Sequence, residues 1–165
     1  MLHLAALLTW AGPALIVSSV VEEVEDGQIA VMKVPPARIL VIDDNPAVVD
    51  LLVTCLGEEG HTVLSALTSD EGLKLVILSR PDLVLLDVAL PGMNGIEVLK
   101  RIRAINPAIG VIMVTGNTDS QLVREALELG ALAYVDKPFD LTYLRRIVAT
   151  ALQPENEKPD GQSSP

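Results

Sequence analysis

Cysteine, histidine and aromatic residues are scarce in this chain of 165 residues. The single cysteine, Cys55, excludes an intrachain disulfide and an all-cysteine metal site, and it fits a reducing, cytoplasmic compartment. Two histidines are too few for a multi-histidine metal centre. With one tryptophan, two tyrosines and one phenylalanine, the core must be built from Leu, Ile, Val and Ala. That composition suits buried parallel strands and the helices that cover them.

Basic side chains are also in deficit, with 12 Lys and Arg against 22 Asp and Glu and a formal net charge of −10. Direct nucleic-acid binding is therefore not expected, because it depends on neutralising phosphates. Charge and composition divide the chain into an apolar and acidic extension (1–34), a folded domain (35–153) and a polar tail (154–165). The tail has no aliphatic side chain and three prolines, so we expect it to be disordered.

Short aliphatic runs alternate with helical patterns in the folded domain, which predicts βαβ units around a parallel sheet. The expected strands are 38–42, 62–66, 83–87, 110–114 and 133–135. The expected helices follow Asn45-Pro46, run from Thr68 to about Ser79, surround Ile96 to Ile102, run from Thr118 to about Leu129, and follow Asp140. Two of them begin with a capping-box pattern, Thr68 to Glu71 and Thr118 to Gln121.

Acidic residues follow two of the predicted strands. Asp43 and Asp44 come directly after the run Ile39 to Ile42, and Asp87 closes the run that begins at Leu83. The carboxyl ends of parallel strands meet at one edge of a sheet, where ligands collect, so these three carboxylates should converge there. Their mutual repulsion predicts a hard divalent cation, and Mg²⁺ is the natural candidate.

Two further polar groups end the fourth and fifth runs. Thr115 supplies a hydroxyl, and Lys137, followed by Pro138, supplies a compact cation. Together these groups predict a phosphoryl site. The carboxylates would hold a metal, the lysine would neutralise phosphoryl oxygens, and the hydroxyl would donate a hydrogen bond to a third phosphoryl oxygen. Asp87 is then the candidate nucleophile, because an aspartyl carboxylate can attack phosphorus to form an acyl phosphate.

Four segments, ILVIDDN, LVLLDVALPGMNGIEVLKRI, VIMVTG and AYVDKPF, resemble the receiver domains of two-component response regulators, the CheY-like family. The resemblance covers about residues 37–152 in order, without a large insertion. It implies an α/β, flavodoxin-like (βα)5 fold, a doubly wound parallel sheet with strand order 2-1-3-4-5.

The resemblance also assigns the metal site. It implies that Asp87 is the phosphoacceptor and that Asp43, Asp44 and Asp87 hold Mg²⁺, with Asp44 as a direct ligand. The backbone carbonyl of Ala89, two residues beyond the acceptor, is implied as the third protein ligand.

Further roles implied by the resemblance concern the switch. The hydroxyl of Thr115 is expected to follow the phosphoryl group, Tyr134 to act as the aromatic rotamer switch, and Lys137 to be the family's lysine with a cis bond to Pro138. The output surface is expected on the fourth helix, fifth strand and fifth helix, where phosphorylation alters binding of a downstream protein.

The function implied is that of a stand-alone response regulator in a His-Asp phosphorelay. It would take a phosphoryl group from a histidine kinase or a histidine phosphotransfer protein and catalyse its own phosphorylation and dephosphorylation, without being an enzyme in the usual sense. The length after the last predicted helix argues against a fused DNA-binding domain. Alternatives are a phosphorylation-independent adaptor and a phosphatase of the haloacid dehalogenase type, although the latter needs an Asp-x-Asp pattern.

The extension leaves three possibilities open. It could be dispensable, with Met32 as the first residue of the functional chain, it could pack as a hairpin or helix, or it could anchor the protein in a membrane. Met1 to Val21 has no charged side chain, but Pro13 interrupts it, no basic residue precedes it and acids follow it. Membrane association is therefore not expected.

Several other residues have simpler interpretations. Cys55 is expected to be a small buried side chain rather than a reactive thiol. His61 is expected at the surface, and Lys100, Arg101 and Arg103 are expected to form a solvated helix face.

Overall fold

Strands and helices alternate strictly along the computed structural model, which describes residues 35–116 and 119–153. The elements are β1 (Arg38–Ile42), α1 (Pro46–Gly57), β2 (Thr62–Ala66), α2 (Ser69–Ser79), β3 (Leu83–Leu86), α3 (Gly95–Ile105), β4 (Gly110–Thr115), α4 (Ser120–Glu128), β5 (Ala133–Asp136) and α5 (Leu141–Ala151). The extension 1–34 and the tail 154–165 lie outside the described residues, so the predictions about them are not tested.

The five strands form one parallel sheet in the order β2-β1-β3-β4-β5. The predicted flavodoxin-like fold and strand order are therefore confirmed. The chain moves from β1 outward to β2 and then crosses back to β3 on the other side of β1, so the order reverses between β1 and β3. A crevice for ligands forms at the carboxyl ends of strands at such a reversal.

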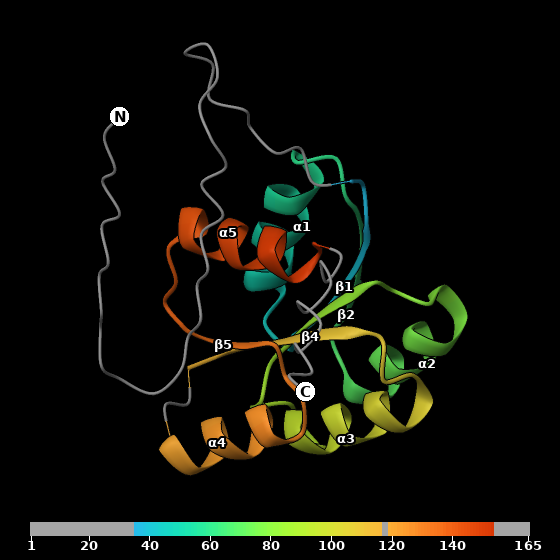
Figure 1. Ribbon diagram of the computed structural model, residues 1–165, viewed down its shortest axis with the longest axis vertical. Helices are drawn as coiled ribbons and strands as arrows, with labels where there is room; N and C mark the ends of the chain where they lie inside the picture. Colours follow the sequence, from blue (N-terminus) through green and yellow to red (C-terminus); the bar gives the residue numbers. More distant parts are fainter. Residues whose placement is uncertain (1–34, 117–118, 154–165) are drawn as a thin grey trace, which may run out of the picture. The chain divides into compact units, whose positions relative to one another are not determined.

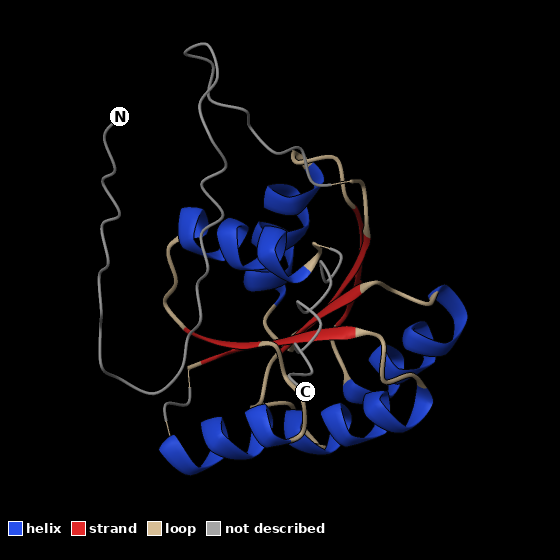
Figure 2. Cartoon of the chain, in the orientation of Figure 1, coloured by secondary structure: helices blue, strands red, loops and turns tan. Residues whose placement is uncertain are grey.

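The sheet is the middle of three layers (Figure 1). Helices α1 and α5 cover one face, and α2, α3 and α4 cover the other, while Figure 2 shows the strands between them in red. Alternating residues of β1 supply both cores: Ile39 and Val41 pack in the cluster with α1 and α5, and Leu40 and Ile42 pack in the cluster with α2 and α3. Aliphatic side chains thus fill the core on both faces of the sheet, as the scarcity of aromatic residues predicts.

Caps fix where the helices begin. The side chain of Thr68 accepts a hydrogen bond from the Glu71 amide, as the capping-box pattern predicts, and the Glu71 carboxylate accepts from the amide of Leu67. The prediction for α4 is wrong by one residue, because Asp119 is the N-cap and accepts from the Gln121 amide at 2.8 Å. An Asp is at least as good a cap as a Thr, and Thr118 itself lies outside the described residues.

The expectation that His61 lies at the surface is wrong. The side chain is only 9% exposed, and its Nδ1 accepts a hydrogen bond from the Ala37 amide at 3.2 Å. Ala37 precedes the first residue of β1, and its carbonyl accepts from the Thr62 amide. His61 therefore accepts a hydrogen bond from a backbone donor, the Ala37 amide, that has no partner in the β1–β2 ladder. No local sequence pattern shows this tertiary contact.

The expectation of a solvated basic face holds for two of its three members. Lys100 and Arg101 are exposed and make exposed ion pairs with Glu125 and Glu97. Arg103 differs, because its guanidinium donates to four backbone carbonyls, those of Pro107, Ile109, Leu129 and Gly130. Burial lowers the pKa of Arg103, and its contacts tie the end of α3 to the end of α4.

Cys55 is buried in α1, as expected for a small core side chain. The sequence did not show that Arg145 on α5 is the neighbour of Cys55. Nε of Arg145 donates to the Cys55 Sγ at 3.1 Å and also lies 3.2 Å from Glu59. Arg145 thus joins the two helices of one layer. Within 35–116 and 119–153, none of the helices combines the length and apolarity needed to cross a bilayer.

Replacing His61 by Ala is expected to lower the free energy of unfolding by about 1 kcal/mol, because the Ala37 amide loses its acceptor. Urea denaturation measures the change. His61→Asn is the matched control, since its side-chain oxygen can take the place of Nδ1. Equal losses for both variants would show that the hydrogen bond contributes nothing.

Candidate functional site

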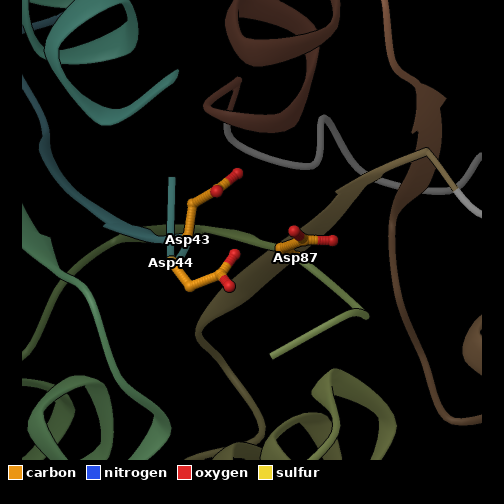
Figure 3. Close-up of side chains that lie close together, drawn as sticks. All are labelled: Asp43, Asp44 and Asp87. Carbon is orange, nitrogen blue, oxygen red and sulfur yellow. The ribbon is translucent and has the colours of Figure 1, made fainter. Parts of the chain in front are cut away.

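Three carboxylates meet at the carboxyl edge of the sheet, as the sequence predicts. Ile42 and Leu86 are register partners on β1 and β3, so the residues that follow them, Asp43 and Asp87, lie side by side. One carboxylate oxygen from each of Asp43, Asp44 and Asp87 lies within 4.8 Å of the others. Figure 3 shows the three side chains gathered at this edge. Asp43 and Asp87 are 2% and 5% exposed, whereas Asp44 is exposed.

Short turns hold the two buried carboxylates in place. Oδ1 of Asp43 accepts from the Asn45 amide at 2.9 Å, and Oδ1 of Asp87 accepts from the Ala89 amide at 3.1 Å. Such turns occur where an Asp ends a strand and bonds the backbone two residues on. The Asn45 side chain caps α1 by accepting from the Ala47 amide. Each carboxylate thus keeps its second oxygen for the site.

Lys137 brings the cation that the local sequence around the acids lacks. Its Nζ lies 2.5 Å from Oδ2 of Asp43 and 3.1 Å from Oδ2 of Asp87, although these residues are 94 and 50 positions away. Burial by itself would lower the pKa of Lys137, but the hydrogen bonds and charges of the two aspartates outweigh it and raise that pKa. The lysine therefore stays protonated between two buried carboxylates.

The segment that carries Lys137 is fixed by β4 and β5. The Lys137 amide donates to the carbonyl of Thr115 at 2.9 Å, and the bond between Lys137 and Pro138 is cis, as the resemblance implied. Thr115 is the last residue of β4 and is fully buried. The predicted hydroxyl and the predicted ammonium group thus follow adjacent strands at the same edge.

Tyr134 lies partly buried on β5, in an acidic field. Burial raises the pKa of Tyr134, and the negative charges of Asp136, Asp87 and Asp119 raise it further. The influence of Asp87 connects the tyrosine electrostatically with the carboxylate cluster. The sequence singled out Tyr134, but it did not reveal that the charges of Asp87 and Asp119 act on it.

Gly95 sets how closely α3 approaches the loop after β3. A Cβ at this position would lie 2.1 Å from the Asp87 carbonyl oxygen and 2.7 Å from Cα of Val88, distances that no side chain tolerates. The Gly95 amide donates to the Val88 carbonyl at 2.9 Å. The backbone of the central aspartate is therefore packed directly against the first turn of α3.

The donor set fits a hard cation. Carboxylate oxygens are the ligands that Mg²⁺ prefers, and it commonly takes one or two carboxylates with several waters. Three such oxygens within 4.8 Å of one another, one of them on exposed Asp44, provide that chemistry together with access from solvent. Among the described residues, Asp43, Asp44 and Asp87 are thus the acidic group that could hold a divalent metal ion.

The fold and the site together define a doubly wound α/β protein with three acids and a lysine at the carboxyl edge of its parallel sheet. The family model "Response regulator receiver domain" matches residues 39–149. Sporulation initiation phosphotransferase F of Bacillus subtilis is 40% identical over 111 residues, which cover 67% of this chain and 90% of the relative. This chain therefore belongs to the response regulator receiver domain family.

Other comparisons agree with that assignment. The DNA-binding response regulator MtrA of Mycolicibacterium smegmatis is 40% identical over 122 residues. The match covers 74% of this chain but only 53% of that relative, so this chain spans about half of the relative's length. The crystal structure of a CheY-like response regulator receiver domain protein from Methanospirillum hungatei superposes with a TM-score of 0.69 at 34% identity. The match covers 71% of this chain and 94% of that one. Membership of the family implies a histidine kinase or phosphotransfer protein as partner.

Replacing Gly95 by Ala should force the α3 terminus and the Asp87 backbone apart. We expect a loss of about 1 to 3 kcal/mol in the free energy of unfolding, typical of overpacking, and weaker Mg²⁺ binding. Urea denaturation and metal titration measure the two effects. Gly57→Ala is the control, because a Cβ added at Gly57 would meet nothing within 4 Å and helix propensity favours Ala. A Gly95→Ala protein as stable as the Gly57→Ala protein would contradict the expected clash.

In a Tyr143→Phe background, Tyr134 is the remaining tyrosine and can be titrated alone. Its phenol should ionise above the ordinary value of about 10, because burial and three nearby acids disfavour the phenolate. Asp136→Asn should move that pKa downward. The ultraviolet absorbance of the phenolate against pH measures both, and an unchanged pKa in the Asp136→Asn protein would rule out the electrostatic link.

Proposed function

We propose that this protein accepts a phosphoryl group on Asp87 from a histidine kinase or a histidine phosphotransfer protein, in a Mg²⁺-dependent reaction, as a response regulator of a two-component phosphorelay. The observation that carries the proposal is the position of Lys137 Nζ, which contacts Asp43 and Asp87 at once. A lysine and three carboxylates at one strand edge suit phosphoryl transfer, which depends on positioning and charge neutralisation.

Asp87 is the nucleophile in this proposal. Its Oδ1 is engaged by the Ala89 amide, and its Oδ2 faces Lys137. In the step, a carboxylate oxygen of Asp87 forms a bond to phosphorus while the bond from phosphorus to the donor histidine nitrogen breaks. The bonding electron pair stays with the imidazole, and the product is an acyl phosphate.

Asp43, Asp44 and Asp87 would hold the metal, with Asp44 as a direct ligand and the backbone carbonyl of Ala89 as a further one. A bound Mg²⁺ would neutralise charge on the phosphoryl oxygens. Asp43 and Asp87 are buried and oriented by their turns, so little reorganisation of the chain is needed to present them. Asp44 is exposed, so the metal site would be open to solvent on the side of this residue.

Lys137 and Thr115 would bind the transferred group. When Asp87 becomes phosphorylated, Lys137 exchanges a carboxylate partner for a phosphoryl oxygen and stays charged, since the surrounding acids keep its pKa raised. Thr115 ends the neighbouring strand and would donate its hydroxyl to another phosphoryl oxygen. These roles follow from the family resemblance and from the shared edge.

The switch would act through Tyr134. Movement of Thr115 toward the phosphoryl group makes room for the ring to turn inward, and the surface of α4, β5 and α5 changes with it. A local charge then biases a two-state element, and a downstream protein reads the result. The lone buried cysteine is consistent with action in a reducing cytoplasm.

Intact-mass measurement after incubation with acetyl phosphate and Mg²⁺ tests the proposal. We expect one added phosphoryl group, lost in Asp87→Asn and in an EDTA sample. Asp50→Asn, which removes an exposed acid on α1, is the matched control and should label normally.

Two outcomes would contradict the proposal. Unimpaired labelling of Asp87→Asn would place the phosphoryl group elsewhere. A folded wild-type protein that takes no phosphoryl group from either acetyl phosphate or phosphorylated histidine phosphotransfer proteins would favour the phosphorylation-independent adaptor.

A further inference from the structure

A buried serine is the first residue of α2. Ser69 is only 3% exposed, and its hydroxyl donates to the carbonyl of Met93 at 2.8 Å, although the two residues are 24 positions apart. A buried hydroxyl is normally paired in this way. The contact joins α2 to the segment between β3 and α3, residues 87–94, which we call the β3–α3 connection.

The hydroxyl of Ser69 is not needed to begin the helix. Thr68 is the N-cap of α2, and its side chain accepts from the Glu71 amide. A serine in a helix often bonds a carbonyl of its own helix, as Ser79 does with Leu75 at 2.6 Å. Ser69 instead bonds a residue outside its helix, so its hydroxyl serves a contact between two elements.

The β3–α3 connection carries two groups of the proposed site. Asp87 is its first residue, and the carbonyl of Ala89 is the further metal ligand in the function proposed above. The amide of Ala89 bonds Asp87, and the amide of Met93 donates to the Pro91 carbonyl at 3.2 Å, so these hydrogen bonds stay within the connection. The hydroxyl of Ser69 comes from a different element, and it therefore ties the connection to α2.

The first turn of α2 is itself fixed against β1. A Cβ added at Gly72 would lie 2.5 Å from Cδ1 of Ile42, so α2 packs closely against the residue that precedes Asp43. The amide of Asp43 donates to the carbonyl of Ala66, the last residue of β2, at 3.1 Å. Helix α2 is thus held next to Asp43, and its serine extends this support to the β3–α3 connection.

Close packing does not join α2 and the β3–α3 connection along their whole contact. Residues of both elements line a hollow: Thr68, Ser69, Asp70, Pro91, Gly92 and Met93. Where side chains leave such a space, a directed hydrogen bond holds two elements at a fixed distance. The bond from Ser69 to Met93 has this place in the fold.

We propose that Ser69 is a positioning residue for the metal site, an inference that rests on the proposed function. Its hydroxyl holds the β3–α3 connection so that Asp87 and the Ala89 carbonyl keep the arrangement that Mg²⁺ needs. Because Mg²⁺ demands near-ideal octahedral geometry, a small displacement of the connection weakens its binding.

Isothermal titration of the full chain with Mg²⁺ tests this role. Ser69→Ala should bind Mg²⁺ about three- to tenfold more weakly than the wild type, less than the roughly 10- to 100-fold loss typical of groups bonded directly to a metal ligand. Ser69→Thr keeps a hydroxyl and should restore the wild-type affinity. Ser79→Ala is the matched control, because it removes a serine hydroxyl that bonds within α2, and it should bind Mg²⁺ like the wild type.

Labelling with acetyl phosphate separates positioning from chemistry. In Ser69→Ala, the Mg²⁺ concentration that gives half the maximal labelling rate should rise by the same factor as the Kd. The rate at saturating Mg²⁺ should remain that of the wild type, because Asp87 and Lys137 are unchanged.

Three results would overturn the role of Ser69. A Ser69→Ala protein that binds Mg²⁺ as tightly as Ser79→Ala, even if urea unfolds it more easily, would make the serine purely structural. A folded Ser69→Thr protein that binds as weakly as Ser69→Ala would show that the hydroxyl is not the cause. A labelling rate that stays low at saturating Mg²⁺ would place the defect in the chemical step.

Failure of the proposed function would look different. A wild-type protein that takes no phosphoryl group, while Ser69→Ala still binds Mg²⁺ more weakly than the wild type, would end the phosphoacceptor role and leave the positioning role standing. Normal labelling of the wild type, with unchanged Mg²⁺ binding in Ser69→Ala, would do the reverse.

Discussion

The contact of Lys137 with two buried aspartates is the interaction on which the rest of the site depends. Asp43 and Asp87 are almost inaccessible to solvent and lie side by side at the ends of β1 and β3. Buried carboxylates so close together repel each other and lose hydration, so they need a cation. Lys137 supplies it from the far end of the chain, and it thereby holds the β5–α5 connection over the acidic pocket.

The sheet brings residues that are distant in the sequence together in one pocket. Parallel strands all present their carboxyl ends at the same edge, so four strand ends can deliver the carboxylates, Thr115 and Lys137 without any long loop. The approach of Gly95 to the Asp87 carbonyl packs α3 directly against that edge, while Arg103 joins the ends of α3 and α4 through backbone carbonyls. The backbone of Asp87 is therefore in direct contact with α3, and α3 is joined in turn to the end of α4.

The two edges of the sheet differ in chemistry. The carboxyl edge is polar and holds the acids and the lysine, as expected for phosphoryl transfer. The amino edge ends in an apolar hollow beside the point where the chain enters β1.

The sequence by itself determined the alternation of strands and helices, the strand-end positions of Asp43, Asp44, Asp87, Thr115 and Lys137, and the family. Periodicity and caps act within a few residues, and strand ends share an edge in any parallel sheet, so these features can be deduced locally. Only the tertiary structure decided that Lys137 bridges Asp43 and Asp87, that His61 is buried against Ala37, and that Arg103 binds carbonyls of the α4–β5 turn. These contacts join residues 24 to 94 positions apart, and whether a polar side chain is solvated or paired depends on which neighbours the fold brings to it.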